Sequence, residues 1–324
     1  MRIIRALQLD PRASYARIGA VLGLAEGAVR RRYLRLHADG VVHVAGVLDP
    51  GALGQSRWLV RLRCRPDSVP AITTGLARRD DVNWIAVGAA GTEITCAVRS
   101  RTTVDRDDLI GRRLPRTAAV LDISAAVILH QFVGGRGHYW ATLSGVLTPR
   151  EEAALGHPPV VESPVVATTP ATLEAADDKL LATLAVDGRA PLSALAAAAD
   201  LTPSRAARHL QALIERRVVH IDVEISPAAL GLHTRAVLLL RIHPAQVHAA
   251  GRALALDPAI PFATAVSGRD NVLAVANCRD LGALYELTTT GLGDLPGLRS
   301  LEVSPIDYQV KQAATGVVAD RLVP

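Results

Sequence analysis

The stretch TPSRAARHLQALIERR, residues 202–217, has the pattern of a helix with a defined start. Thr202 suits the N-cap, whose side-chain oxygen accepts a backbone N–H, and Pro203 suits the first helical position. Three apolar residues recur at helical spacing and should pack inward, namely Ala206, Leu210 and Leu213. The same spacing turns Arg208 outward, toward solvent or a partner.

The flanking residues extend this helix into a recognisable unit. Residues 177–188 and 191–200 have helical patterns, and residues 218–226, VVHIDVEIS, alternate as a strand does. Helix, helix, short turn, helix and β-wing is the order of a winged helix-turn-helix. In that motif the last helix enters the major groove of DNA.

A second unit of the same kind lies 177 residues upstream. At that constant offset Arg31 falls on Arg208, and VVH at 41–43 falls on VVH at 218–220. The segment PGALG of the first half likewise meets PAALG of the second. An offset held without gaps over so many positions predicts an internal duplication.

In the first copy the third helix is predicted over residues 25–40, AEGAVRRRYLRLHADG. Its inward positions are Val29, Tyr33 and Leu36. Arg31 and Arg35 point nearly opposite to that face, and Arg30 and Arg32 flank it. Eight arginines accompany three acids within residues 1–40, against six cations and five acids within 177–217. The first copy should therefore carry more of the salt-dependent attraction to phosphate.

Each copy continues with the pattern β-α-β-β-α-β, over residues 55–133 and 232–314. This is the pattern of a ferredoxin-like plait, one sheet with both helices on one face. The predicted fold class is α+β, with two copies of a winged helix-turn-helix (1–48 and 176–226) each followed by such a plait. The other face of each sheet is then free to pair with a second copy.

The two halves are joined by residues 134–175, which we interpret as a tether. It contains one short helical pattern, TPREEAAL, with Thr148 as the cap and Pro149 at the first position. The prolines from residue 156 onward predict an extended chain. Trp140, with Tyr139 and His138, lies in a glycine-rich turn that could dock the tether onto a plait.

The composition indicates a protein with a net positive charge and reduced cysteines. The net charge is +5 and the pI about 9.5, which permits a polyanionic partner without requiring one. The three cysteines lie far apart in strand-like runs and are expected to be reduced core residues: Cys64, Cys96 and Cys278. No apolar run approaches the roughly 18 residues of a spanning helix. We expect a cytoplasmic protein with no membrane partner.

Two motifs resemble a known family. They are LGLAEGAVRRRYLRLHADGVV with VLDPGALG, and LTPSRAARHLQALIERRVV with ISPAALG. The leucine, the turn, the arginine-rich third helix and the Pro-x-x-Leu-Gly connector resemble the AsnC/leucine-responsive (Lrp) family of transcription regulators, in a tandem form. The resemblance implies sequence-specific binding of double-stranded DNA. The positions that would contact DNA are Arg30, Arg31, Arg32, Arg35, Ser204, Arg205, Arg208 and His209.

The same resemblance implies a small amino-acid-like effector and a homo-oligomer assembled through the plaits. The effector would lie near the turn between the second and third strands of each plait, at Gly91, Thr92, Glu93, Gly268, Arg269, Asp270 and Asn271. Glycine allows a tight turn, and an acid with amide N–H groups can hold an α-amino and an α-carboxylate group. The simpler alternative is a β-turn with solvated charges.

Three features depart from the family pattern. The third helix of the first copy begins with AEG, so it lacks a side-chain cap. In the second copy, Arg217 stands where the first copy has Gly40. The first helix is also short, because Met1 falls on Asp178. We expect either that this helix has lost a turn or that the true start lies upstream of Met1.

The sequence predicts no catalytic site, no cofactor and no metal, because no nucleophile triad, phosphate loop or ligand spacing occurs. His43 and His220 match each other in the wing, and His130, His138 and His157 lack metal spacing. We therefore expect that the protein is not an enzyme. One alternative is an enzyme like the sirohaem decarboxylases, which pair this motif with this plait. The predicted second strands, VNWIAVG and IPFATAVS, contain no histidine for such a site. Another alternative is an effector-binding assembly protein with vestigial DNA-binding units.

Overall fold

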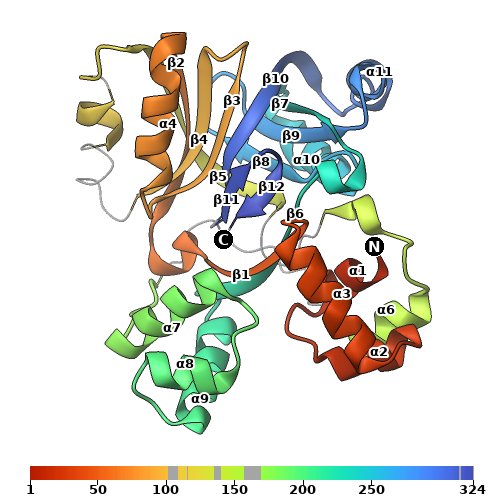
Figure 1. Cartoon of the computed structure of the whole chain (residues 1–324). Helices are drawn as coiled ribbons and strands as arrows, with labels where there is room; N and C mark the ends of the chain where they lie inside the picture. The colour runs from red at the N-terminus through yellow and green to blue at the C-terminus, as the bar shows by residue number, and fades with distance from the viewer. Residues whose placement is uncertain (101–108, 115, 135–139, 157–168, 314, 324) are drawn as a thin grey trace.

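Two small helical units lie at one end of the molecule and a large sheet lies at the other (Figure 1). The computed structural model describes residues 1–100, 109–114, 116–134, 140–156, 169–313 and 315–323. We call the helical units the first head (residues 2–48) and the second head (residues 175–225). His138, Tyr139, His157 and most of the proline-rich tether lie outside the described residues.

The first head consists of three helices and one strand. They are α1 (Arg2–Leu9), α2 (Tyr15–Leu22), α3 (Glu26–Ala38) and β1 (Val42–Leu48). Ile4, Leu7 and Ile18 are completely buried between the helices. Ser14 caps α2 by accepting a hydrogen bond from the backbone N–H of Arg17. No side chain caps α3, as the AEG start predicts.

The second head has the same order of elements. They are α7 (Ala175–Val186), α8 (Leu192–Ala198), α9 (Pro203–Glu215) and β6 (Val219–Ile225). The predicted start of α9 is confirmed, because the Thr202 side chain accepts a hydrogen bond from Arg205 N and Pro203 is the first helical residue. The cap satisfies one of the backbone donors that a helix start leaves free.

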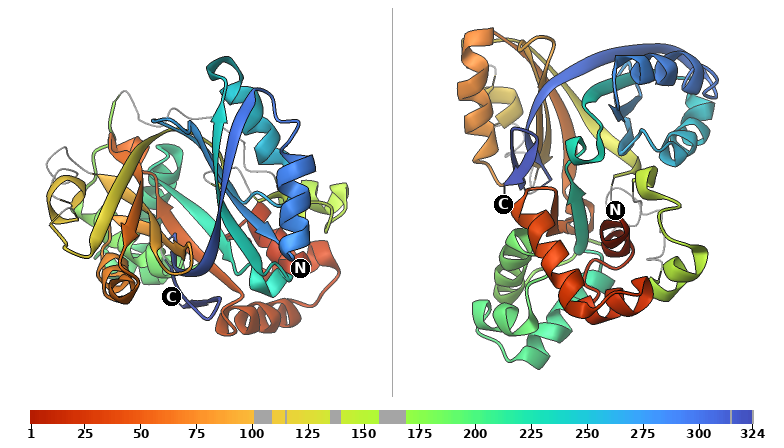
Figure 2. Two further views of the ribbon diagram at one scale, coloured as in Figure 1. Left: turned by 90° about the horizontal axis from the view of Figure 1, so that it is seen from above. Right: turned by 45° about the vertical axis from the view of Figure 1, so that its right-hand side comes forward.

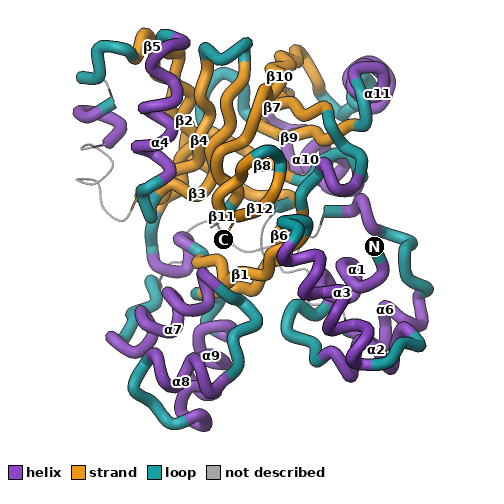
Figure 3. Tube along the Cα trace, in the orientation of Figure 1, coloured by secondary structure: helices purple, strands orange, loops and turns teal. Residues whose placement is uncertain are grey.

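The strand that follows each third helix does not form a wing of its own. β1 and β6 pair with each other, antiparallel, from Val42 opposite Ile225 to Leu48 opposite Val219. The predicted β-wing is therefore corrected to a two-stranded ribbon shared by the two heads (Figure 3). A lone strand leaves its backbone groups unpaired, and a partner of equal length satisfies them.

The first half continues as one sheet with a helix against it. Its elements are β2 (Ser56–Cys64), α4 (Val69–Ala77), β3 (Val82–Gly88), β4 (Glu93–Ser100) and β5 (Val120–Val133), and a short 3-10 turn, η1 (Pro50–Leu53), leads into β2. The strand order is β3-β4-β2-β5, all antiparallel. The second helix of the β-α-β-β-α-β pattern predicted over 55–133 lies only partly within the described residues, which show a π-helical turn at Leu109–Arg113.

The second half repeats this arrangement. Its elements are β7 (Thr234–Ile242), α10 (Val247–Leu256), β8 (Phe262–Val266), β9 (Val272–Cys278), α11 (Leu281–Glu286) and β10 (Leu298–Gln312). The strand order is β8-β9-β7-β10. Both halves thus have the strand order of a split βαβ plait.

The two sheets are not separate plaits with free faces, which corrects the predicted architecture. β5 pairs with β2 up to Val127 and then with β8 from Ile128 onward. β10 pairs with β7 up to Ile306 and then with β3. Eight strands therefore close into one barrel (Figure 2). Closure pairs both edges of each sheet, and unpaired edges are a liability in any sheet.

Apolar side chains fill the barrel on both sides of its wall. Outside, α4 covers one half and α10 the other, each over a buried cluster. Inside, where the two halves face each other, a smaller cluster is buried: Leu59, Ile128, Val237, Leu239, Val266 and Leu273. Burial of this inner set joins the two halves into one unit.

Two segments that follow the sheets return to the heads. The predicted helix after Thr148 is present as α6 (Pro149–Leu155), and Thr148 forms a capping box with Glu151. Leu155 is buried in the core of the first head. At the C-terminal end, β11 (Thr315–Val318) and β12 (Arg321–Val323) form a hairpin beside β10 that the sequence patterns did not predict. Leu322 N donates to the carbonyl of Gly40 at 2.9 Å.

Among the described residues no helix has the length and apolar character needed to cross a membrane. The three cysteines are buried and unpaired. Burial raises the pKa of the Cys96 thiol to about 12.

Candidate nucleic-acid interface

The turn between α2 and α3 is tight in the first head because two glycines allow it. Gly23 has a φ of +67°, in the left-handed region, and ends α2. Leu24 N donates to Gly19 O at 2.8 Å, and a side chain at Gly19 would meet the Leu24 carbonyl at 2.5 Å. This close approach sets the angle between the two helices. In the second head Asp200 takes the left-handed position with a φ of +56°.

The burial of α3 follows its predicted periodicity. Val29 is completely buried and Tyr33 is 6% exposed. Burial raises the pKa of the Tyr33 hydroxyl to about 12, with smaller contributions from Tyr15 and Asp187, while Arg189 acts in the opposite direction. The predicted DNA-contacting residues of α3 are all exposed: Arg30, Arg31, Arg32 and Arg35. The outward face of this helix is therefore basic and accessible.

The arginines of α3 are largely without acidic partners. Arg35 lies 3.6 Å from Asp39 in a solvent-exposed i,i+4 pair, which is worth little in water. Within the described part of the chain, Arg30, Arg31 and Arg32 form no ion pair. Other basic residues of this head are engaged, since Arg2 and Arg5 pair with Glu151 and Glu152 of α6. The free positive charge of the first head is thus concentrated on α3.

The exposed face of α9 is less basic. Ser204, Arg205 and Arg208 are exposed, as predicted, and Ala206, Leu210 and Leu213 are buried. His209 points back into its own head, where its Nδ1 lies 2.8 Å from Asp177 Oδ1. The structure therefore places His209 among intramolecular contacts, apart from the other three candidates. Arg217 adopts a φ of +59°, close to the +67° of the aligned Gly40.

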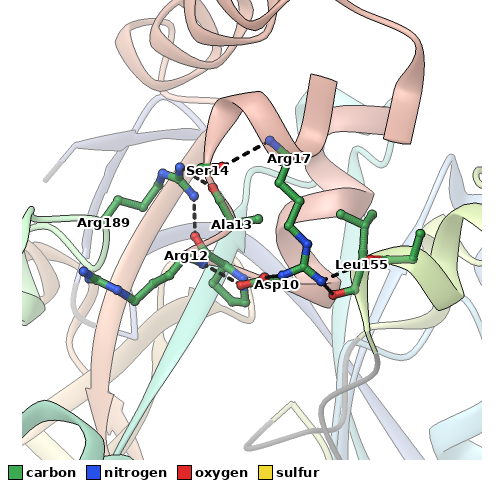
Figure 4. A network of polar contacts seen from close by, with 9 residues as sticks. Asp10, Arg12, Ala13, Ser14, Arg17, Leu155 and Arg189 are labelled. Carbon is green, nitrogen blue, oxygen red and sulfur yellow. Dashed lines mark hydrogen bonds and ion pairs between the residues drawn. The ribbon is translucent and has the colours of Figure 1, made fainter. Parts of the chain in front are cut away.

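Two arginines hold the heads together in a reciprocal manner, and Figure 4 shows one side of it, the Arg189 side chain beside Ala13. Arg12 donates to the carbonyl oxygens of Gly188 and Ala190, at 2.5 and 2.9 Å. Arg189 donates to those of Pro11 and Ala13, at 2.5 and 2.8 Å. These four bonds and the β1–β6 ribbon fix the relative position of the two third helices.

Sequence reasoning did not assign a role to Arg12 or Arg189. A signal was present, because the two residues coincide at the offset of 177 that relates the halves. Burial lowers the pKa of the Arg12 guanidinium, with the neighbouring Arg189 charge as a smaller cause. Arg189 also lies over the rings of Tyr15 and Tyr33, 4.8 and 5.2 Å from their centroids.

The first predicted effector turn contacts the other half of the barrel. Gly91 N donates to Asp307 Oδ2 of β10 at 2.8 Å, and Thr92 Oγ1 donates to the carbonyl of Ala89. Both carboxylate oxygens of Glu93 accept hydrogen bonds from Arg61, at 2.9 and 3.1 Å. Glu93 is therefore already used to hold neighbouring strands.

The second turn contains both engaged and exposed groups. The Asn271 side chain donates to Ile242 O at 2.9 Å and accepts from Ile242 N at 2.8 Å, so it connects two strands. Gly268, with a φ of +111°, and Arg269 are exposed, and Asp270 is partly exposed. Of all the predicted effector residues, Arg269 and Asp270 have the most accessible charged groups.

The remaining histidines and tryptophans have structural neighbours. Trp140 Nε1 donates to Pro258 O at 2.7 Å, so this residue does dock the tether onto the second half. His130 lies against Phe132 and His248, with ring centroids 4.7 and 5.7 Å away. Among the described residues no group of three or more His, Cys, Asp or Glu side chains is placed to bind a metal.

Comparison with known proteins identifies the first head. Residues 1–37 match the model of the AsnC-type helix-turn-helix domain. The HTH-type transcriptional regulator LrpA of Pyrococcus horikoshii is 24% identical over 131 residues, which is 40% of this chain and 93% of the relative. LrpA of Pyrococcus abyssi is 23% identical over the same length. These relatives correspond to less than half of this chain.

A solved structure resembles the chain over nearly its whole length. The sirohaem decarboxylase NirDL, in complex with an iron-uroporphyrin III analogue, covers 96% of this chain and 92% of its own, with a TM-score of 0.65 and 14% identity. At this identity the likeness concerns the fold. It nevertheless overturns the expectation that the protein is not an enzyme, because that expectation rested on sequence motifs alone. A fold can carry several unrelated functions.

The chain thus has a mixed α/β fold shared with an enzyme, and at its N-terminus a DNA-binding domain of known type. The LrpA relatives connect that domain to transcription regulation. The predicted resemblance to the AsnC/Lrp family of DNA-binding transcription regulators is confirmed.

Proposed function

We propose that this protein regulates transcription by binding double-stranded DNA with α3 and α9, both supplied by one chain. The observation that carries the proposal is the exposed arginine face of α3, which has few acidic partners. Guanidinium groups form paired hydrogen bonds with guanine edges and with phosphates. Arg30 and Arg31 would lie nearest the bases, and Arg32 and Arg35 mainly at phosphate.

The connection between the heads supports binding by a single chain. Regulators with one head per chain need two subunits to contact two half-sites. Here the β1–β6 ribbon and the Arg12 and Arg189 contacts hold two heads within one molecule. The separation of the half-sites is then a property of the chain and does not depend on protein concentration.

A gel-shift assay on DNA from the gene's own upstream region tests the proposal. Arg31→Ala and Arg208→Ala, made separately, should each weaken a specific complex, and the wild-type affinity should fall steeply with rising salt. The absence of a complex at low salt would refute DNA binding. An unchanged affinity in both variants would refute the assigned helices.

An amino-acid-like effector is part of the same proposal. The accessible charges of Arg269 and Asp270 favour the second turn, because Glu93 of the first turn is engaged by Arg61. Titration calorimetry with single amino acids should show binding that Arg269→Gln weakens. Binding that Arg269→Gln leaves unchanged would place the effector elsewhere.

Association of several chains is a further part of the proposal. The plaits already pair within one chain, so any larger assembly must use other surfaces. Leu121 and Leu129 of β5 are both more than half exposed, and exposed apolar side chains are common at interfaces. Light scattering should give a mass above that of one chain, and Leu121→Lys with Leu129→Lys should reduce it.

A second candidate function is modification of a tetrapyrrole. The full-length fold match to NirDL favours it, and that protein binds an iron-uroporphyrin III analogue. Incubation of the purified chain with sirohaem under anaerobic conditions tests it. A changed absorption spectrum together with a decarboxylated product would support this candidate. An unchanged spectrum would exclude it.

A further inference from the structure

The hairpin formed by β11 and β12, residues 315–323, lies between the barrel and the heads (Figure 1). β11 pairs with the end of β10, with Gly316 opposite Lys311, so the hairpin extends the barrel sheet. Its inward side chains are well packed, since Val317 is 9% exposed and Leu322 is 4% exposed. The hairpin is therefore a firm part of the barrel that reaches toward the heads.

One strand of the hairpin contacts the glycine just after α3. Leu322 N donates to Gly40 O at 2.9 Å. A Cβ atom at Gly40 would lie 2.8 Å from both Arg321 Cβ and Leu322 O. A residue with a side chain therefore does not fit at this position while the hairpin holds its place.

The second head shows that the backbone conformation alone does not require this glycine. Arg217 aligns with Gly40 and has a φ of +59°, against +67° for the glycine. An arginine is thus accommodated in nearly the same left-handed conformation. The close approach of β12 accounts for the glycine in the first head, and it explains why the two copies differ at this position.

Asp320, in the turn of the hairpin, connects the barrel to the ribbon. Its Oδ1 atom accepts a hydrogen bond from Arg235 of β7 at 2.7 Å, and Arg235 is only 8% exposed. Its carbonyl oxygen accepts from Ser226 Oγ, directly after β6, at 2.6 Å. Ser226 N in turn donates to Val41 O at 2.9 Å, between α3 and β1. One residue thus joins a barrel strand to the end of the ribbon nearest α3, in part through a charged hydrogen bond.

The turn of the hairpin has a conformation that its residues disfavour. Ala319 and Asp320 have φ values of +48° and +60°, both in the left-handed region. Two-residue hairpin loops of this kind favour asparagine and glycine, and alanine has no side chain that compensates for the strain. Such conformations persist where the surrounding contacts determine them. The contacts of Asp320 and Leu322 provide that restraint.

The ribbon needs support if α3 is to keep a fixed orientation. Among the described strands β1 and β6 pair only with each other, and an isolated two-stranded ribbon is marginally stable in water. We propose that the β11–β12 hairpin fixes the angle of α3 relative to the barrel, with Asp320 as the positioning residue. The proposal rests on DNA binding by α3 and α9, and it specifies what makes the separation of their half-sites strict.

Two variants release the hairpin from opposite sides. Asp320→Gly removes the carboxylate that binds Arg235 and leaves a residue that suits the turn. Gly40→Asn places a Cβ atom against β12, while its backbone conformation stays accessible because asparagine tolerates a positive φ. Val318→Thr is the matched control, because Val318 lies in the same hairpin and is 65% exposed.

Distances between spin labels test the position of α3 without DNA. Labels at Leu34→Cys in α3 and Ala71→Cys in α4 lie at exposed positions, and the native cysteines are buried. Double electron–electron resonance should give a broader distance distribution in Asp320→Gly and in Gly40→Asn than in the wild type. The control Val318→Thr should give the wild-type distribution.

The aligned position on α9 is the internal comparison. Gln211→Cys corresponds to Leu34→Cys at the offset that relates the halves, and its distance to Ala71 should broaden less. Equal broadening for both helices would overturn the assignment to α3. An unchanged distribution for α3 in Asp320→Gly would overturn the role of the hairpin altogether.

DNA with altered half-site separation gives the functional readout. Fluorescence anisotropy compares the duplex from the gene's own upstream region with a copy that has two base pairs inserted between the half-sites. The insertion should weaken wild-type binding about tenfold or more, because heads of fixed orientation cannot then both engage. In Asp320→Gly this penalty should fall to about threefold or less, since α3 can then adjust.

Two outcomes of the DNA measurement separate the possible failures. An equal loss of affinity for both duplexes in Asp320→Gly would show that the hairpin only stabilises the fold, and it would overturn the positioning role. If the wild type binds neither duplex, DNA binding itself fails, and the distance measurement still decides whether the hairpin fixes α3.

Discussion

The two heads share one order of elements but are stabilised differently. In the second head α7 has 12 residues, Thr202 caps α9, and Asp177 binds His209. In the first head α1 has 8 residues and α3 has no side-chain cap. Arg32, which aligns with His209, is exposed. The first head instead receives a helix from the tether. The second head is therefore stabilised more by contacts among its own helices, whereas the first has a more basic surface and is supported by a helix from the tether.

The largest expected effect concerns that external support. Leu155 of α6 is 2% exposed within the first head. Leu155→Ala should cost about 3 kcal/mol of local stability, the usual range for a buried leucine. Hydrogen exchange should speed up in α1 and α2 and stay unchanged in α7 to α9. Leu192→Ala in α8, 39% exposed, is the control and should have little effect. Equal effects in both heads would contradict the difference described here.

The next effect concerns DNA affinity. Arg30→Ala combined with Arg31→Ala should weaken binding about 100-fold, and Arg205→Ala combined with Arg208→Ala about tenfold, because the first head has the denser basic face. Fluorescence anisotropy at several salt concentrations measures both, and the salt dependence should fall more for the first pair. A larger loss from the second pair would reverse the proposed ranking of the heads.

Changes at the helix caps should have smaller effects on stability, and these effects should have opposite signs in the two heads. Thr202→Ala removes the hydrogen bond to Arg205 N and should cost about 1 kcal/mol. Ala25→Ser supplies the missing cap and should stabilise the first head by up to about 1 kcal/mol. Hydrogen exchange at the first turns of α9 and α3 measures the two changes. If Ala25→Ser does not stabilise the first head, the start of α3 is determined by the glycine turn before it and not by the missing cap.

The smallest effect is a dependence on pH through His43 in the ribbon. Burial is the main cause that lowers the pKa of His43 below its ordinary 6.5, and His37 adds to it while Asp187 opposes it. The unfolded chain then takes up this proton first. The stabilising contribution is complete above about pH 6.5 and is lost as the pH falls below it. Urea unfolding at about pH 7.5 and about pH 5 should show a smaller loss of stability in His43→Gln than in the wild type.

Local patterns in the sequence predicted the elements well. The spacing of Val29 and Tyr33, the cap at Thr202 and the uncapped Ala25 were all correct, because each depends on residues a few positions apart. The same holds for Thr148 and Pro149 at the start of α6. Periodicity determines which face of a helix is apolar, and that face must be buried somewhere.

The pairing of elements across the chain was not predictable from the same patterns. The strand β1 was predicted as the wing of its own head, and it pairs with β6 of the other head. The length of the last strands was a missed signal, since β5 and β10 have 14 and 15 residues and a plait strand needs only about 5 or 6. Nothing in the residues around Glu151 and Glu152 showed that α6 would bind the first head. For the effector and DNA sites the residues were named, but their contacts with ligands stay predictions.

The closed barrel has a consequence for the making of the protein. The edge of β3 pairs with β10, which emerges from the ribosome more than 200 residues later. Until then the growing chain has a sheet whose β3 edge is open, a form prone to mispairing with other chains. Contacts between such distant segments also make folding slow. Synthesis rate and chaperone supply should therefore limit the yield of this protein more than the stability of its finished form does.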